Sequence, residues 1–348
     1  MTARVWFVLP EGADEPATDP QVLAQAGTNG AADACIGGPG AGEEVPSGAL
    51  LSRARYPSAL WTRRRETTLG VVDAPHAQAR PALGATDGLV AALGPGLLLV
   101  GALVPDLRPL VALLVVSGWA LLGLTRRPGA IAWAAALPLA VVLTWPWLLG
   151  VDVPVGDPAC RDVLSAITLR RIAVAVVGLA IVGALAVVYR SGRAELGLAR
   201  PGRVEALVAV GGCLVLVAGG LVIGPAIARP FFGELDYPVP LAALVPAILF
   251  GIANGVLEEV LYRGALQAWL ARLAPIGWAI GFQGLVFGIV HAGPEVLTLL
   301  PVHIALLTGV GIAAGLARWK LGSLWIPIGI HVGADIALYI GLACRAAP

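Results

Sequence analysis

The sequence predicts an all-α protein: a polytopic integral membrane bundle of about eight or nine transmembrane helices, preceded by a disordered amino-terminal tail. Hydrophobic residues make up 58% of the 348 residues and charged residues only 13%, whereas soluble domains carry roughly 25% charged residues. The mean hydropathy is +0.84. From Leu89 onward, apolar runs follow one another, many of them close to the roughly 20 helical residues that cross a bilayer.

Residues 1–87 differ from the rest of the chain. They are rich in Gly, Ala, Pro, Asp and Glu, show neither helical nor strand periodicity, and contain the basic run Arg63–Glu66. Such a composition is typical of disorder. The first thirty residues lack the continuous apolar segment of a cleavable signal peptide, so we expect membrane insertion to depend on the first transmembrane helix.

The candidate membrane helices follow in order along the chain. They are Leu89–Val104, Leu107–Leu124, Ala130–Leu149, Ile172–Tyr189, Val204–Ala228, Leu241–Leu257, Ile276–His291, Val296–Ala317 and Ser323–Ala343. The first two are short and interrupted by Pro95, Pro105 and Pro109, so they could form either a hairpin or one tilted span. No internal repeat is visible, which disfavours a transporter built from inverted halves.

The distribution of arginine predicts an orientation, because cytoplasmic loops carry an excess of Lys and Arg. One set of connections carries Arg126, Arg127, Arg190, Arg193, Arg200, Arg203, Arg263, Arg272, Arg318 and Lys320. The alternate set carries Arg108, Arg161, Arg170, Arg171 and Arg229, together with several acidic residues. We therefore expect the first set and the tail to be cytoplasmic, in a multi-pass protein of the plasma membrane. Arg170 and Arg171 lie on the side that this rule disfavours.

Charge and cysteine content exclude several other classes of function. The net charge of +1 offers no basic surface for nucleic acid. Cys35, Cys160, Cys213 and Cys344 are scattered, without CxxC spacing, and so predict neither a metal knuckle nor a disulfide framework. We interpret them as small structural thiols.

A few ionisable residues lie within or at the ends of the last four spans. They are Glu258, Glu259, Arg263, His291, His303, His331 and Asp335. Such residues are rare in membrane helices and usually face a cavity. Glu259 and Arg263 are four residues apart, which favours an ion pair on one helix face. Glu258 is rotated by about 100° from Glu259 and has no such partner, so it either faces a site or is solvated at the headgroup boundary.

The histidines have both functional and structural interpretations. His331 and Asp335 share a helix face, where the carboxylate can fix the tautomer of the imidazole or simply hydrogen-bond in helix packing. His291 follows Phe287 by four residues, and Phe287 either packs between helices or forms the floor of a pocket. His303 has no polar neighbour at helical spacing, and we interpret it as a bundle histidine.

Two kinds of chemistry suit this set of residues. A glutamate and a histidine can activate water for attack on a carbonyl group. Alternatively, Glu258, His291 and His331 could hold a zinc ion that activates a bound water. The HExxH pattern of soluble zinc proteases and the G-x-S-x-G elbow of serine hydrolases are both absent from the sequence.

Three short motifs resemble those of the CAAX prenyl endopeptidase and bacteriocin-processing (CPBP, or ABI) family of intramembrane proteases. The family patterns are E-E-x-x-x-R, F-x-x-x-H and H-x-x-x-N. In this sequence they correspond to "EEVLYR" from Glu258, "FGIVH" ending at His291 and "HVGAD" from His331. The resemblance covers roughly residues 200–345, and three motifs in order at membrane spacing are a specific signal.

The resemblance implies an intramembrane endopeptidase that hydrolyses a peptide or protein substrate at the bilayer, for example a lipid-modified substrate. No cofactor is expected, and zinc is the lesser option. It implies catalytic roles for Glu258, His291, His331 and Asp335. Glu259, Arg263 and Phe287 would support them. Asp335 departs from the usual asparagine and, when ionised, cannot donate to an oxyanion. The implied organisation is a tail at 1–87, accessory helices at 88–200 and a protease domain at 201–345.

Two alternatives belong to other functional classes. A catalytically inactive membrane scaffold, acting as an immunity or partner-binding protein, would share the same fold and would not require Glu258. A proton-coupled transporter could use the same ionisable groups. Retention of every motif position except the asparagine favours the enzyme.

Overall fold

The computed structural model describes residues 84–125, 127, 129–148, 166–232, 243–291 and 300–340, all within one unit of the chain, Ala59–Pro348. These residues form helices and short connections, with no strand among them. The predicted all-α class is confirmed for this part of the chain. The predicted tail lies outside the described residues except for its end, where helix α1 begins at Ala85.

The first two predicted spans form a helical hairpin. Helix α1 (Ala85–Leu103) and helix α2 (Arg108–Leu124) are joined by the 3₁₀ turn η1 (Pro105–Leu107). Pro105 and Pro109 stand in the first turns of η1 and α2, where a missing N–H breaks no helical hydrogen bond. The prolines therefore separate two helices instead of bending a single tilted one.

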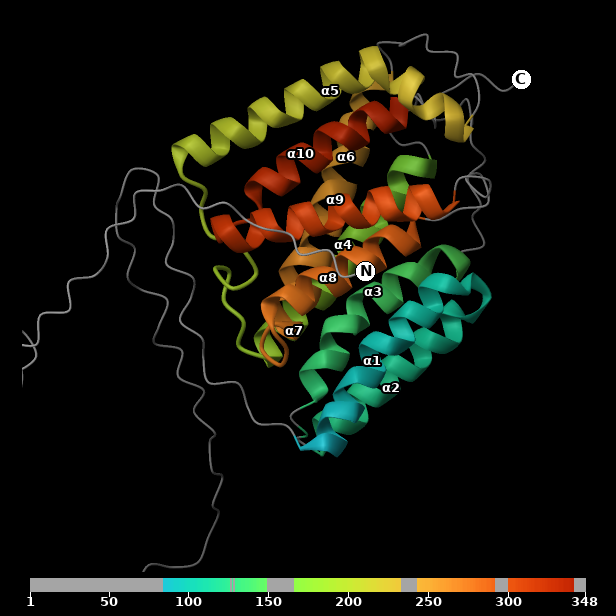
Figure 1. Ribbon diagram of the computed structural model, residues 1–348, viewed down its shortest axis with the longest axis vertical. Coiled ribbons are helices and arrows are strands. Elements are labelled where there is room, and N and C mark those ends of the chain that lie inside the picture. The colour runs from blue at the N-terminus through green and yellow to red at the C-terminus, as the bar shows by residue number, and fades with distance from the viewer. Residues whose placement is uncertain are drawn as a thin grey trace, which may run out of the picture. The chain divides into compact units, whose positions relative to one another are not determined.

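Helix α3 (Ala130–Leu148) packs against both arms of this hairpin, as Figure 1 shows. Its Trp133 side chain lies against Gly94 of α1 and Gly118 of α2, so close that a Cβ on Gly118 would lie 2.1 Å from the indole ring. The indole N–H donates to the carbonyl of Val90 over 2.8 Å. Glycine at these positions makes room for the largest side chain of the interface.

Helix α4 (Ala166–Val188) packs against α6, and helix α5 (Arg203–Phe232) packs along α10. The connection between α4 and α5 is held by long-range contacts. Arg272 forms an ion pair with Glu195 at 2.6 Å, and the Trp325 indole donates to the carbonyl of Ala199 over 2.6 Å. These contacts join the connection to the helices that carry the motifs.

Helix α6 (Leu244–Glu259) does not end where the predicted span ended, at Leu257. It continues through a π-helix, η4 (Val260–Leu266), into α7 (Gln267–Leu270), and the whole forms an apolar helical segment of 27 residues. The sequence suggested an end here because two glutamates resemble a membrane boundary. In the structure neighbouring helices enclose them, so the helix runs on and Glu258 lies near its middle.

The remaining helices approach one another closely at glycines. Helix α8 (Ile276–Val290) packs on α9 (Leu300–Leu321), and a Cβ on Gly288 would lie 2.2 Å from the Thr308 hydroxyl. Helix α10 (Trp325–Leu338) packs on α6, and a Cβ on Gly255 would lie 3.0 Å from the backbone nitrogen of Val332. Close approach of α6 and α10 brings Glu258, Glu259 and His331 near one another.

Six of the described helical segments have the length and composition to cross a membrane. They are Ala85–Leu103, Pro105–Leu124, Ile167–Val188, Arg203–Ile223, Leu244–Leu270 and Pro301–Leu321. Three shorter apolar helices occur at Ala130–Thr144, Ile276–Val290 and Trp325–Leu338. Each predicted span thus has a helical counterpart, and six of them reach spanning length within the described residues. The chain is a membrane protein with many apolar helices.

Candidate active site

Glu258 and two histidines meet in the middle of the bundle. Glu258 lies one residue before the end of α6, His291 caps the end of α8, and His331 lies in α10. The Oε2 atom of Glu258 is 3.5 Å from Nε2 of His291 and 3.6 Å from Nε2 of His331. The three side chains that the sequence singled out therefore converge, although they are separated by up to 73 residues of chain.

Glu258 Oε2 is buried and has no hydrogen-bond partner among the described residues. Both distances to the histidines exceed the 2.7–3.2 Å of an N–H···O hydrogen bond. Polar contacts of such length are often bridged by water, and a buried, unsatisfied carboxylate oxygen is itself a marker of a bound water or of a catalytic role. The geometry suits a carboxylate that holds and deprotonates a water molecule.

Backbone contacts orient His291. Its Nδ1 lies 2.7 Å from the carbonyl oxygen of Phe287. Because a carbonyl only accepts, Nδ1 carries the proton, and in a neutral ring Nε2 is the unprotonated atom that faces Glu258. His303 of α9 contacts the carbonyl oxygen of His291 through its own Nε2, at 3.1 Å. His303 therefore holds the backbone of the site in place.

His331 is oriented by Glu259, which the sequence did not indicate. Its Nδ1 donates to Oε1 of Glu259 over 2.8 Å. Asp335, the partner suggested by helical spacing, lies 3.6 Å from the Nε2 of His331 and accepts a hydrogen bond of 2.9 Å from Asn254 instead. The tautomer of His331 is thus set across two helices, by α6, and not within α10.

The predicted ion pair between Glu259 and Arg263 is confirmed. Arg263 Nη1 lies 2.9 Å from Glu259 Oε1, and the two side chains are 1% and 2% exposed, respectively. The same Glu259 oxygen accepts from both Arg263 and His331. Arg263 lies in the π-helix η4, and π-helical turns are frequent at functional sites.

Phe287 packs between the motifs. Its ring is 4.4 Å from the His291 ring and 6.0 Å from the His331 ring, centroid to centroid. The Arg263 guanidinium lies over its face at 4.4 Å, and Tyr262 meets its edge at 5.1 Å. The packing interpretation of Phe287 is the one that the structure supports, because the side chain packs between helices and contacts both imidazoles. Phe287 is not among the described residues that line the cavity beside Glu258.

Sequence reasoning missed Asn254 and Tyr262. Each lies four residues from Glu258, one on either side, and so on its helix face. Asn254 binds Asp335, and Tyr262 lines the cavity beside Glu258. Their position in an apolar segment, at helical spacing from Glu258, was the signal that could have found them. An amide and a phenol are less unusual in a membrane helix than a charged side chain, so they were not selected as candidates.

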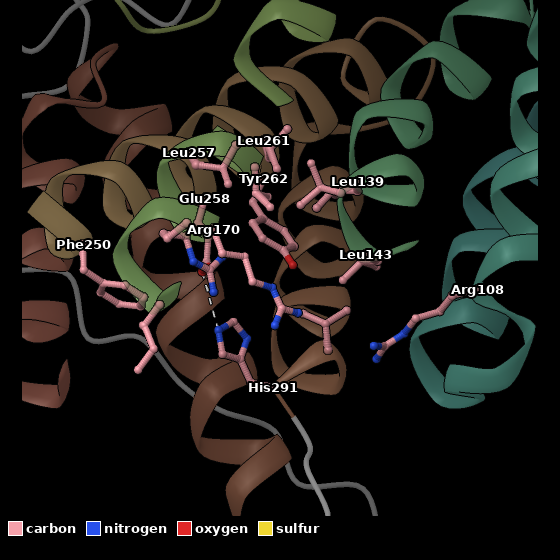
Figure 2. Close-up of a pocket in the computed structure, with 15 residues that line it drawn as sticks. Arg108, Leu139, Leu143, Arg170, Phe250, Leu257, Glu258, Leu261, Tyr262 and His291 are labelled. Carbon is pink, nitrogen blue, oxygen red and sulfur yellow. Dashed lines mark ion pairs between the residues drawn. The ribbon is translucent and has the colours of Figure 1, made fainter. Parts of the chain in front are cut away.

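A cavity of about 500 Å³ opens beside Glu258 and His291, as Figure 2 shows. Its volume is in the range of small-molecule and peptide pockets. Figure 2 shows Arg108 extending into it from α2, across from Glu258 and His291. The lining residues are Arg108, Leu139, Val142, Leu143, Ile167, Arg170, Arg171, Val174, Phe250, Leu257, Glu258, Leu261, Tyr262, Val290 and His291.

Within the described part of the chain, no group of three or more His, Cys, Asp or Glu side chains has the arrangement of a metal site. Glu258, His291 and His331 were the predicted zinc ligands. His331 Nδ1 is engaged by Glu259 and its Nε2 is shared between Glu258 and Asp335. The set offers the right atom types for zinc without the arrangement of a formed site.

Residues 240–337 match a family model that is described as type II CAAX prenyl endopeptidase Rce1-like. This part of the chain is similar to that family. The match includes Glu258, His291, His331 and Asp335 and confirms the resemblance carried by the three motifs. It covers less than a third of the chain, and α1 to α5 lie outside the Rce1-like segment. No curated protein and no solved structure matches the chain.

The buried ion pair yields a stability prediction. Replacing Arg263 by methionine leaves the Glu259 carboxylate buried with only His331 to compensate it, and breaking such a pair costs about 3–5 kcal/mol. We expect Arg263→Met to lower the free energy of unfolding by that amount, measured by denaturant unfolding in detergent.

Arg127→Met is the matched control, because Arg127 pairs with Asp87 at 3.3 Å while its side chain is 59% exposed. An exposed pair contributes only about 0–1 kcal/mol. Equal losses in the two variants would contradict a bracing role for Arg263.

Proposed function

We propose that the protein is an intramembrane endopeptidase that hydrolyses peptide bonds of a membrane-associated or lipid-modified substrate. The observation that carries this proposal is the buried, unsatisfied Oε2 of Glu258, which faces two imidazoles and lines a cavity inside a membrane bundle. The Rce1-like match over the same residues supports it. We assign cleavage to the domain at 201–345, with the helices at 88–200 completing the cavity.

In the proposed mechanism Glu258 is the general base. It takes a proton from a water molecule held between its Oε2 and the Nε2 of His291, and the water oxygen attacks the peptide carbonyl carbon. The resulting tetrahedral intermediate collapses when the carbon–nitrogen bond breaks. The leaving amine then receives the proton from Glu258, so the carboxylate is regenerated.

The oxyanion of the intermediate requires donors. We assign this role to His331, whose Nε2 lies 3.6 Å from Oε2 of Glu258, and to the hydroxyl of Tyr262, which lines the cavity. The carboxylates of Glu259 and Asp335 flank the His331 ring and stabilise the positive charge that it carries when both nitrogens are protonated. Asp335 thus acts through His331, in place of the direct donation available to an asparagine.

The first test of the mechanism uses Glu258→Gln. The amide is similar in shape but cannot accept the proton of the attacking water, and loss of a general base typically costs 10²–10⁴-fold in rate. We expect at least one membrane protein to accumulate uncleaved in cells that carry Glu258→Gln, detected by quantitative comparison of membrane proteomes with wild-type cells.

Glu205→Gln is the matched control, because Glu205 lies in the first turn of α5 and bonds the backbone of Gly202. Cells with this variant should resemble the wild type. Wild-type cleavage of a verified substrate by purified Glu258→Gln would exclude Glu258 as the base. Membrane proteomes that do not differ between wild-type and Glu258→Gln cells would instead favour the inactive scaffold.

A second prediction concerns metal. Because the described residues contain no group of three or more His, Cys, Asp or Glu side chains with the arrangement of a metal site, we propose that cleavage proceeds without zinc. Purified protein treated with a strong chelator should keep its rate and contain far less than one zinc per chain by elemental analysis. Loss of activity with chelation, restored by added zinc, would establish the metal-dependent alternative.

A third prediction concerns topology. We propose a multi-pass protein of the plasma membrane whose tail faces the cytoplasm. Arg127 after α2, Arg190 after α4 and Arg318 in the last turn of α9 would lie on the same side. A single cysteine introduced at position 192 in a variant lacking the four native cysteines should be shielded from an impermeant maleimide in intact cells. A cysteine at position 106 should react, and the reverse pattern would invert the topology.

A further inference from the structure

Three arginines line the cavity beside Glu258, and the proposed mechanism uses none of them. They are Arg108 at the start of α2, and Arg170 and Arg171 near the start of α4. All three lie outside the residues that match the Rce1-like model. They also belong to the side of the membrane where arginine is disfavoured. Cations at this place in an apolar bundle require a reason.

The charge of the cavity wall is unbalanced. Among the lining residues in the described part of the chain, Glu258 is the only carboxylate, against the guanidinium groups of Arg108 and Arg171. The side chain of Arg170 has an interaction of its own and is not counted in this balance. A wall of this composition attracts an anion. The remaining wall is largely aliphatic, with leucine, valine and isoleucine side chains, so the molecule that fits carries an apolar part as well as a negative group.

Neighbouring contacts position two of the arginines without neutralising them. The Nε of Arg108 donates to the carbonyl of Gly101 over 3.2 Å, and the carbonyl of Arg108 accepts from Thr144 of α3 over 3.0 Å. The Arg171 guanidinium lies 5.4 Å from the centre of the Phe250 ring. A guanidinium has five N–H donors, and Arg108 uses only its Nε in the bond to Gly101. The two terminal nitrogens of Arg108 therefore remain available for a bidentate pair with a carboxylate.

We propose that Arg108 and Arg171 form a carboxylate-binding subsite that anchors the substrate beside Glu258. That the bound molecule is a substrate follows from the proposed function, on which this inference rests. A peptide carboxylate held by the arginines, with an apolar portion against the aliphatic wall, would place a nearby peptide bond against Glu258 and His291. We commit to a carboxylate because the proposed substrate is a peptide, and a planar carboxylate matches the guanidinium fork in a bidentate pair.

Binding of two matched probes tests this subsite. N-dodecanoylglycine and N-dodecanoylglycinamide share an apolar chain and differ only in the carboxylate. Their affinities are measured by calorimetry on the full wild-type chain in nanodiscs of zwitterionic phosphatidylcholine, with mass spectrometry to verify that the probes stay intact. We expect the carboxylate probe to bind at least tenfold more tightly than the amide.

Variants assign the preference to residues. Arg108→Gln and Arg171→Gln should each reduce the ratio of the two affinities at least threefold, because a charge-assisted bond to the carboxylate is lost. Arg193→Gln, which removes an exposed arginine from the connection between α4 and α5, should leave the ratio unchanged. Arg171→Lys keeps the charge without the bidentate fork and should reduce the ratio less than Arg171→Gln. If Arg171→Gln does not fold, the comparison of Arg171→Lys with the wild type serves as the test.

Three results would overturn the proposal. They are equal affinities of the two probes for the wild type, a preference that the arginine variants do not change, and tighter binding of dodecyl phosphate than of N-dodecanoylglycine. The last result would assign the arginines to a phospholipid headgroup. The assay measures binding without cleavage, so its outcome is independent of whether Glu258 is the catalytic base.

Discussion

The rest of the site depends on the carboxylate of Glu259. One of its oxygens accepts hydrogen bonds from Arg263, in its own helical segment, and from His331 of α10. A buried charge without partners would be strongly destabilising, so this oxygen holds α6, η4 and α10 in one register. The neighbouring Glu258 is thereby turned toward the cavity, where its Oε2 faces two imidazoles.

Glycine makes this arrangement possible at the level of packing. Gly255 lies one turn before Glu258 and Glu259, and a side chain there would meet the backbone of Val332, next to His331. Gly284 and Gly288 similarly bring α8 against α9, which allows His303 to reach the carbonyl of His291. The distances among Glu258, His291 and His331 are therefore set by backbone contacts between helices, and a shift of the helices would separate these three side chains.

The cavity is lined by residues from two parts of the chain, one inside the Rce1-like segment and one before it. Glu258, His291 and Tyr262 come from the Rce1-like segment, whereas Arg108, Arg170 and Arg171 come from the helices before it. Packing of α4 on α6 joins the two parts, with Gly178 against Leu257. Under the proposed function, the Rce1-like segment carries out the reaction and the preceding helices bind the substrate.

Sequence alone is enough to predict the helical class, the approximate spans, the pairing of Glu259 with Arg263 and the polar residues of the candidate site. These properties follow from hydropathy and from spacing along one helix, which are local. Three features emerge from the packing of the helices: the helix carrying Glu258 continues to Leu270, Glu259 and not Asp335 orients His331, and Asn254, Tyr262 and three arginines adjoin the site. Those properties depend on which helix faces lie together, and one sequence contains no direct record of contacts between helices distant along the chain.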